Sequence, residues 1–159
     1  MTIKRIILSF IILISSLSAI AGGIGTWKSY LSYANIQWVE QGGNRLYVLA
    51  SNALYTYNKA DQSIQTYDKQ NGLSSIDIRF IGWNEVAKRL VIVYEDNNID
   101  LMDAKGNVTN VPDYYLKALT ADKTVYGIDM NGAYCYFSTG FGLVKLNVAK
   151  AEISDSYNL

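Results

Sequence analysis

From residue 35 onward, short runs rich in Tyr, Val, Ile and Leu alternate with clusters of Asn, Asp and Gly. Short apolar runs bounded by such turn residues are typical of β-strands. After residue 21, no stretch sustains the i, i+3, i+4, i+7 apolar stripe of an amphipathic helix beyond a few turns. The pattern therefore predicts an all-β fold of antiparallel strands.

The apolar runs also repeat along the chain. The segments NRLYVLA, KRLVIVY and GAYCYFS begin at Asn44, Lys88 and Gly132, so successive starts are 44 residues apart. Each segment is preceded by one further apolar run and followed by two more. The expected strands are therefore 35–41, 44–50, 53–58, 63–68, 76–83, 88–94, 98–103, 107–111, 123–130, 132–138, 142–147 and 151–157.

Four strands in such a unit match a blade of a β-propeller, since WD-type repeats run to about 40–45 residues. The second run of each unit is the most hydrophobic, as in a strand covered on both faces, and the last is the most polar, as at a rim. We expect a partial propeller of about three four-stranded antiparallel blades, at 35–74, 75–118 and 119–159, the last incomplete. Closed propellers have about four to eight blades, so the chain is expected to be part of a longer protein. A curved antiparallel sheet or sandwich is the alternative.

The first 21 residues have the features of a signal peptide. Lys4 and Arg5 precede an apolar run at 6–17, and Ala19-Ile20-Ala21 gives a small-x-small cleavage pattern. The run is shorter than the roughly 20 residues of a bilayer span, although an uncleaved anchor is the alternative. We therefore expect the propeller part to comprise 22–159 and to be exported, to the periplasm or the outer-membrane cell surface.

Composition excludes several kinds of chemistry. The chain carries 14 basic and 14 acidic residues, and loss of Lys4 and Arg5 would leave a charge of about −2. That balance does not indicate a nucleic-acid surface. Histidine is absent, which excludes His-dependent triads, His general bases and His metal ligands. The single cysteine, Cys135, lies in an apolar run and is expected to be a buried packing residue.

Gly140-Phe141-Gly142 is a candidate phosphate-binding loop, because glycines can bring backbone N–H groups close to an anion. Such a loop opens a helix, however, and the residues that follow, LVKLN, alternate as in a strand. Two glycines between apolar runs instead predict a hairpin turn that needs positive φ.

The remaining candidates predict no catalytic, cofactor-binding or metal-binding residue. Asp96 to Asp100 resembles the start of a calcium loop, but the required Gly and Glu positions hold Leu101 and Asn107, so a hairpin turn at Asn97-Asn98 is expected. The pattern gives no reason to pair any two of the carboxylates, which include Asp68, Asp77, Asp100 and Asp129. Most of the 13 tyrosines are expected to pack in the core or at the rim.

Several segments carry a family resemblance. The stretch YNKADQSIQTYDKQNGLSSIDIRFIGWN resembles the junction between blades of two-component-regulator-type propellers, with Asn71-Gly72-Leu73-Ser74 as its turn. VYEDNNIDLMD, NVTNVPD and AYCYFSTGFGLVKLNVAKAEISDSYNL are similar to the N-terminal propeller of the PorZ family, a component of the type IX secretion system in Bacteroidota. The opening GIGTWKSYLSYANIQWVEQGGNRLYVLASNALYTYN is similar to the start of that family, so the resemblance covers essentially all of the mature chain.

The resemblance implies a non-enzymatic cell-surface protein with two propellers and a C-terminal β-sandwich. It implies an attachment complex as the partner, including a PorU-like sortase, and anionic lipopolysaccharide as the molecule to which secreted cargo is joined. The second propeller and the sandwich have no counterpart in this sequence, and no catalytic residue carries over.

Three functions compete at this point. The first is a non-catalytic interaction module of the secretion attachment complex. The second is the periplasmic sensor propeller of a hybrid two-component regulator, which would bind a glycan-type ligand. The third, a carbohydrate enzyme with an acidic funnel, is disfavoured because no paired-carboxylate or histidine motif supports it.

Overall fold

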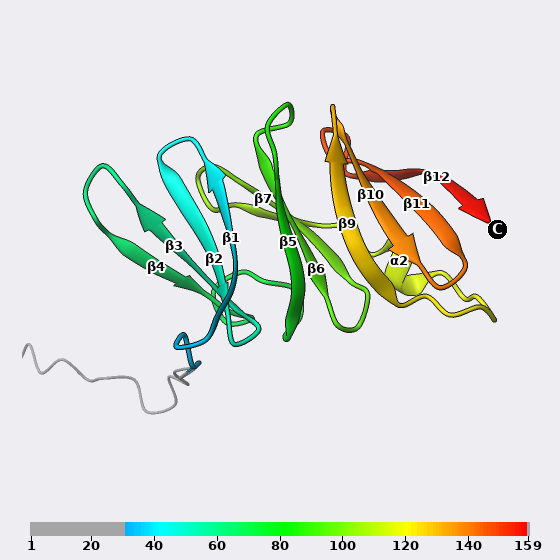
Figure 1. Cartoon of the computed structure of the whole chain (residues 1–159), viewed down its shortest axis with the longest axis horizontal. Helices are drawn as coiled ribbons and strands as arrows, with labels where there is room; N and C mark the ends of the chain where they lie inside the picture. Colours follow the sequence, from blue (N-terminus) through cyan, green and yellow to red (C-terminus); the bar gives the residue numbers. More distant parts are fainter. Residues whose placement is uncertain (1–30, 159) are drawn as a thin grey trace, which may run out of the picture.

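The computed structural model describes residues 31–158, which form three four-stranded antiparallel sheets standing side by side (Figure 1). We call them blade 1, blade 2 and blade 3. Blade 1 contains β1 (Ile36–Gly42), β2 (Arg45–Ala50), β3 (Ala53–Asn58) and β4 (Ile64–Tyr67). Blade 2 contains β5 (Ile78–Asn84), β6 (Arg89–Tyr94), β7 (Ile99–Asp103) and β8 (Val108–Asn110). Blade 3 contains β9 (Val125–Asn131), β10 (Tyr134–Thr139), β11 (Gly142–Asn147) and β12 (Glu152–Asn158).

Strand order within each blade follows the sequence, and the first strands β1, β5 and β9 neighbour one another across the blades. Each blade thus begins at an inner strand and runs outward by hairpins, which is the arrangement of a β-propeller. The twelve strands coincide in order with the twelve expected runs. The predicted all-β fold of three four-stranded blades is confirmed.

Two hydrophobic clusters hold the blades together, one in each interface. The first seam, between blades 1 and 2, contains Tyr47, Leu54, Trp83 and Ile92 among its buried residues. The second seam, between blades 2 and 3, is built in the same way around Val91 and Phe137. A blade therefore buries its apolar side chains against its neighbours rather than within itself, as in other repeat architectures.

The sequence of β6 shows how one strand serves both seams. Side chains alternate between the two faces of a sheet, so Leu90 and Ile92 pack in the first seam while Val91 and Val93 pack in the second. All four are fully buried. In β10 only alternate residues are fully buried, because one face of blade 3 has no neighbouring blade among residues 31–158.

Blade 3 has four strands, as the expected runs at 123–130, 132–138, 142–147 and 151–157 indicate, and its last strand β12 pairs with β11 from Asn147 to Gly142. The expectation that this blade is incomplete stays a prediction. The polar residues of β12 are compatible with a strand because the outermost strand of each blade is largely exposed. Residues 31–158 also include a short helix, α2 (Asp113–Leu116), which is too short for its apolar pattern to reveal.

The repeat spacing is also corrected by one residue. The second strands begin at Arg45, Arg89 and Tyr134, so the second interval is 45 residues rather than 44. A shift of one residue exchanges the two faces of a strand. Cys135 therefore faces blade 2, whereas Val91, its counterpart at a spacing of 44, faces blade 3.

Residues 1–21, the predicted signal peptide, lie outside the described residues, and that assignment stays a prediction. From residue 31 to residue 158, the structure has no helix with the length and apolar character needed to cross a bilayer.

Candidate functional site

The linker between blades 1 and 2 is shaped by its own side chains. The Asp68 carboxylate accepts hydrogen bonds from the backbone N–H groups of Gln70 and Asn71 at 2.8 and 3.0 Å. Asn71 in turn accepts the N–H of Asp68 and donates to the carbonyl of Thr66. Leu73 then turns into the first seam, where it is 5% exposed. The Asn-Gly-Leu-Ser turn thus connects blade 1 to blade 2 and packs its leucine between them.

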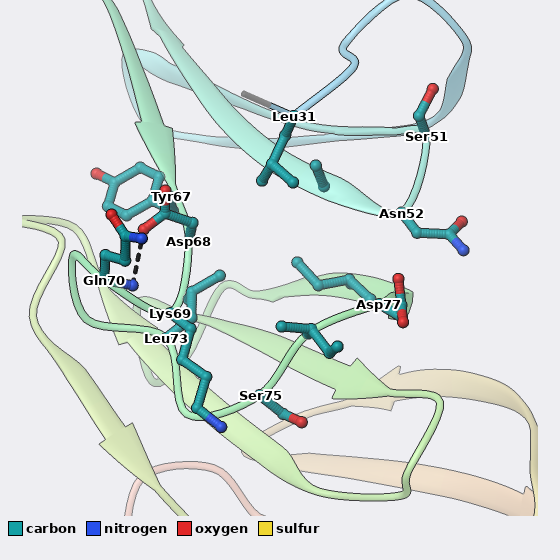
Figure 2. A pocket seen from close by; sticks show the side chains of 13 residues that line it. Leu31, Ser51, Asn52, Tyr67, Asp68, Lys69, Gln70, Leu73, Ser75 and Asp77 are labelled. Carbon is teal, nitrogen blue, oxygen red and sulfur yellow. Dashed lines mark hydrogen bonds between the residues drawn. The ribbon is translucent and has the colours of Figure 1, made fainter. Parts of the chain in front are cut away.

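A cavity of about 320 Å³ lies between this linker and the β2–β3 turn (Figure 2). Its apolar wall includes Leu31, Ala53 and Leu73. Its polar rim comprises Ser51, Asn52, Asp68, Lys69, Gln70 and Asp77. Ile76 also lines the cavity and is 64% exposed, so this loop end of the first seam offers a concave apolar surface to solvent.

Beneath the linker, a fully buried carboxylate joins it to blade 2. Asp100 accepts hydrogen bonds from the backbone N–H of Ser74 at 2.8 Å, the hydroxyl of Tyr94 at 2.6 Å and the side-chain amide of Asn110 at 2.9 Å. Burial and the neighbouring Asp100 charge raise the pKa of Tyr94 well above its usual value, so its phenol stays a donor. The arrangement is structural, because all three of these groups satisfy one buried acceptor.

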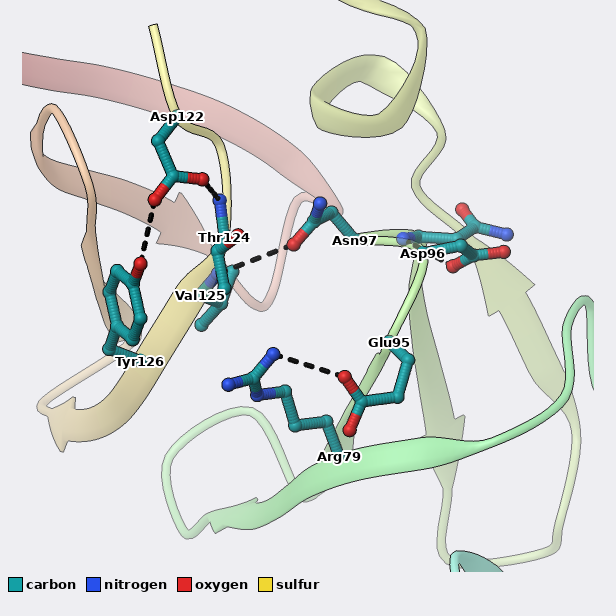
Figure 3. A network of polar contacts seen from close by, with 9 residues as sticks. Arg79, Glu95, Asp96, Asn97, Asp122, Thr124, Val125 and Tyr126 are labelled. Atoms are coloured by element: carbon teal, nitrogen blue, oxygen red, sulfur yellow. Dashed lines mark hydrogen bonds and ion pairs between the residues drawn. The ribbon is translucent and has the colours of Figure 1, made fainter.

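The second seam is closed at the same end by a different network (Figure 3). Arg79 forms an ion pair of 3.0 Å with Glu95, and its guanidinium lies 6.0 Å from the ring centroid of Tyr126. The Tyr126 hydroxyl donates to Asp122 at 2.6 Å. That bond, with those from Thr124, lowers the pKa of the Asp122 carboxyl to about 2. Glu95, Asp122 and Tyr126 are exposed, so the network is expected to contribute little to stability while it positions the loop.

A second concavity, of about 440 Å³, follows the inner strands β1, β5 and β9. Trp38 lines it and is 57% exposed, while its indole N–H donates to Glu40 at 2.7 Å. Asp129 and Met130 contribute from β9. This groove is where a propeller axis would pass.

The carboxylates considered in the sequence fall into separate environments. Asp68 and Asp77 line the cavity at the loop end of the first seam, which we call the loop-end cavity. Asp129 lines the groove along β1, β5 and β9, and Asp100 accepts its three hydrogen bonds in the interior. No group of three or more Cys, Asp or Glu side chains in residues 31–158 is placed to hold a metal ion. Of these four carboxylates, the structure brings only Asp68 and Asp77 to the same cavity, and the absence of catalytic residues stays a prediction.

The two turns considered as possible ligand loops are hairpins. Thr139 pairs with Gly142, so Gly140-Phe141 is the two-residue turn between β10 and β11, and the positive φ falls on Gly142. Asn97 has φ of +67° in the β6–β7 turn, as expected for a residue that tolerates the left-handed region. The sequence gives no direct sign of the cavity at the loop end of the first seam, although Leu73 of the Asn-Gly-Leu-Ser turn lines it.

Cys135 is expected to be chemically inert in the folded protein. It is fully buried in the second seam, and burial raises the pKa of its thiol, so the reactive thiolate is depleted at neutral and mildly alkaline pH. A colorimetric disulfide reagent at pH 8 should label less than about a tenth of the protein within minutes, and all of it after denaturation. Rapid labelling of the native protein would contradict the observed burial.

Comparison with protein families gives a match over residues 46–159 to the family described as the N-terminal β-propeller domain of PorZ, of the type IX secretion system. Among solved structures, PorZ from Porphyromonas gingivalis is similar at 32% sequence identity with a TM-score of 0.77. The similarity covers 84% of this chain and 18% of that chain, which is described as an essential bacterial surface component of the type IX secretion system. None of the curated proteins matches the sequence.

More distant structures share the fold alone. The extracellular domain of a candidate one component system from B. thetaiotaomicron matches at 13% identity and a TM-score of 0.61, over 84% of this chain and 18% of the other. AztD from Citrobacter koseri matches at 14% identity and a TM-score of 0.59, over 79% of this chain and 34% of the other.

Proposed function

The chain belongs to the family of PorZ N-terminal β-propeller domains of the type IX secretion system, and from this premise we propose that it is a non-catalytic interaction module of the secretion attachment complex at the cell surface. In this role it assists a PorU-like sortase in anchoring secreted cargo to anionic lipopolysaccharide. The observation that carries the proposal is the family match over residues 46–159 together with the 32% identity to PorZ.

The protein is proposed to be exported. The PorZ structure is that of a surface component, and the sequence carries the features of a signal peptide at 1–21. The chain spans 18% of the length of the PorZ chain that it matches.

The loop end of the first seam is the surface we assign to a protein partner. Its cavity of about 320 Å³ has an apolar wall, a polar rim and the exposed side chain of Ile76 at its edge. Concave apolar surfaces with a polar border are typical of binding sites. The sensor alternative has weaker support, since the extracellular sensor domains are 13–16% identical and share the fold alone.

A pull-down from outer-membrane extract tests this proposal. With the tagged full-length protein as bait, we expect recovery of a PorU-like sortase, and Ile76→Glu is expected to reduce that recovery by about tenfold because it places a charge on the apolar edge. Val86→Glu is the matched control, since Val86 is 65% exposed against 64% for Ile76 and lies at the opposite end of β5.

Failure of the wild-type protein to recover the sortase would count against membership of the complex. Recovery that Ile76→Glu and Val86→Glu reduce equally would retain membership but remove the loop-end cavity as the contact surface.

A further inference from the structure

The first seam contains three buried polar atoms without a hydrogen-bond partner: Nη1 of Arg45 and the hydroxyls of Tyr47 and Tyr67. Within residues 31–158 these are the only buried side-chain nitrogen or oxygen atoms in that condition. Tyr47 is 0% exposed and Tyr67 is 2% exposed. Buried polar groups in folded proteins are nearly always satisfied, so three orphans in one interface call for a partner outside the chain.

The strand register places these groups on one face of blade 1. Arg45 and Tyr47 are two residues apart on β2, and Tyr67 pairs with Leu54, which itself pairs with Leu49 of β2. The Tyr47 ring stacks on Trp83 of blade 2, with centroids 5.3 Å apart. The Tyr67 hydroxyl reaches the turn before β8, where a Cβ added to Gly106 would lie 2.9 Å from it.

The surroundings of the Tyr47 phenol include charged groups of both signs. Burial raises the pKa of Tyr47, the Arg45 guanidinium acts to lower it, and the Asp103 carboxylate acts to raise it. Asp103 does not satisfy Arg45, because no ion pair joins them and its carboxylate already accepts from the backbone of Lys105 and from Asn107.

The second seam shows what the corresponding position normally contacts. Arg89 begins β6 as Arg45 begins β2, and its Nη1 donates to the backbone carbonyls of Val148 and Ala149 of blade 3 at 3.2 and 3.4 Å. The first seam provides no such acceptor for Arg45 Nη1. A guanidinium nitrogen and two phenol hydroxyls can all donate, and the guanidinium is a cation, so the missing partner should be an acceptor with negative charge.

We propose that the first seam binds one small monovalent anion of the halide class between Arg45, Tyr47 and Tyr67. A concavity of about 470 Å³ leads to Arg45 from solvent, and it is also lined by Lys88, whose ammonium is paired with Glu85. The bound anion satisfies the three orphan donors and joins β2 and β4 of blade 1 to the face of blade 2. The stability of the seam then depends on halide.

Thermal unfolding of the purified full chain tests this, in sodium chloride and in sodium gluconate at equal ionic strength. Chloride should raise the wild-type midpoint by about 4 °C, because a ligand that binds only the folded state stabilises it. Tyr47→Phe, Tyr67→Phe and Arg45→Met should abolish this difference. Tyr57→Phe, the same chemical change on the opposite face of blade 1, should retain it.

Chloride NMR line broadening gives a second readout that does not require cooperative unfolding. The wild-type protein and Tyr57→Phe should broaden the chloride line, and Arg45→Met should not. A chloride effect of equal size in all variants would overturn the proposal. The proposal would also be overturned if Tyr47→Phe and Tyr67→Phe lost stability without any dependence on halide, which would indicate a bound water. It would be overturned as well if these two variants gained stability, which would indicate that the hydroxyls have no hydrogen-bond partner in the folded protein.

Discussion

Replacing Gly142 by alanine is expected to destabilise the protein by about 3 kcal/mol. Gly142 begins β11 with φ of +144°, a region that residues with a side chain rarely adopt. A Cβ at this position would lie 2.0 Å from the backbone carbonyl oxygen of Tyr157 in β12. Backbone atoms cannot move aside without loss of strand pairing, so the substitution should separate the first residues of β11 from β12.

Urea unfolding followed by tryptophan fluorescence measures this loss. Gly132→Ala is the matched control, because Gly132 also has positive φ, at +59°, but a Cβ there meets nothing within 4 Å. The control should lose only about 1 kcal/mol from backbone strain. Equal losses in the two variants would show that the contact with Tyr157 has no role and that strain alone is measured.

The role of this glycine was predictable in part from the sequence. The alternation of LVKLN after Gly142 identified a strand, and a strand on each side of Gly140-Phe141 identified a hairpin turn. Which of the two glycines has positive φ was not predictable, because it depends on how β11 meets β12. The run at 151–157 predicts a strand, but its sequence does not reveal how closely the backbone of Tyr157 approaches Gly142.

The blade repeat was predictable because side-chain alternation is a local property. Apolar runs such as 88–94 are covered on both faces, and their composition shows it without knowledge of the neighbours. The face of the sheet on which each residue lies was harder to predict from the sequence than the strands themselves. The second interval of 45 residues reverses the orientation of Cys135, and a single insertion of this kind leaves the hydrophobic pattern almost unchanged.

The polar interior of the seams could not be predicted at all. Asp100 lies in NIDLMD, which gives no sign that its carboxylate is fully buried, and its partners Ser74 and Asn110 lie on different segments. The orphan group of Arg45, Tyr47 and Tyr67 is likewise visible only when two blades face each other. Composition indicates which residues are buried on average, but hydrogen-bond satisfaction depends on tertiary contacts.

Substitution of Asp100 by alanine is expected to have the largest effect of any single change considered, a loss of about 4 kcal/mol. The change leaves the Ser74 N–H, the Tyr94 hydroxyl and the Asn110 amide without their shared acceptor in a site with no solvent exposure. Each donor then retains its desolvation cost with no hydrogen bond to offset it. Because Ser74 lies in the linker, the loss should also loosen the connection between blades 1 and 2.

Urea unfolding again gives the free energy, and Asp155→Ala, an exposed aspartate of β12, is the control that should be nearly neutral. A double-mutant cycle with Tyr94→Phe separates the contributions. Removing the phenol hydroxyl in the Asp100→Ala background should recover about 1 kcal/mol, because one stranded donor disappears. Additive losses in the double variant would mean that the two groups do not interact energetically, and the buried network would then contribute packing alone to the junction between blades.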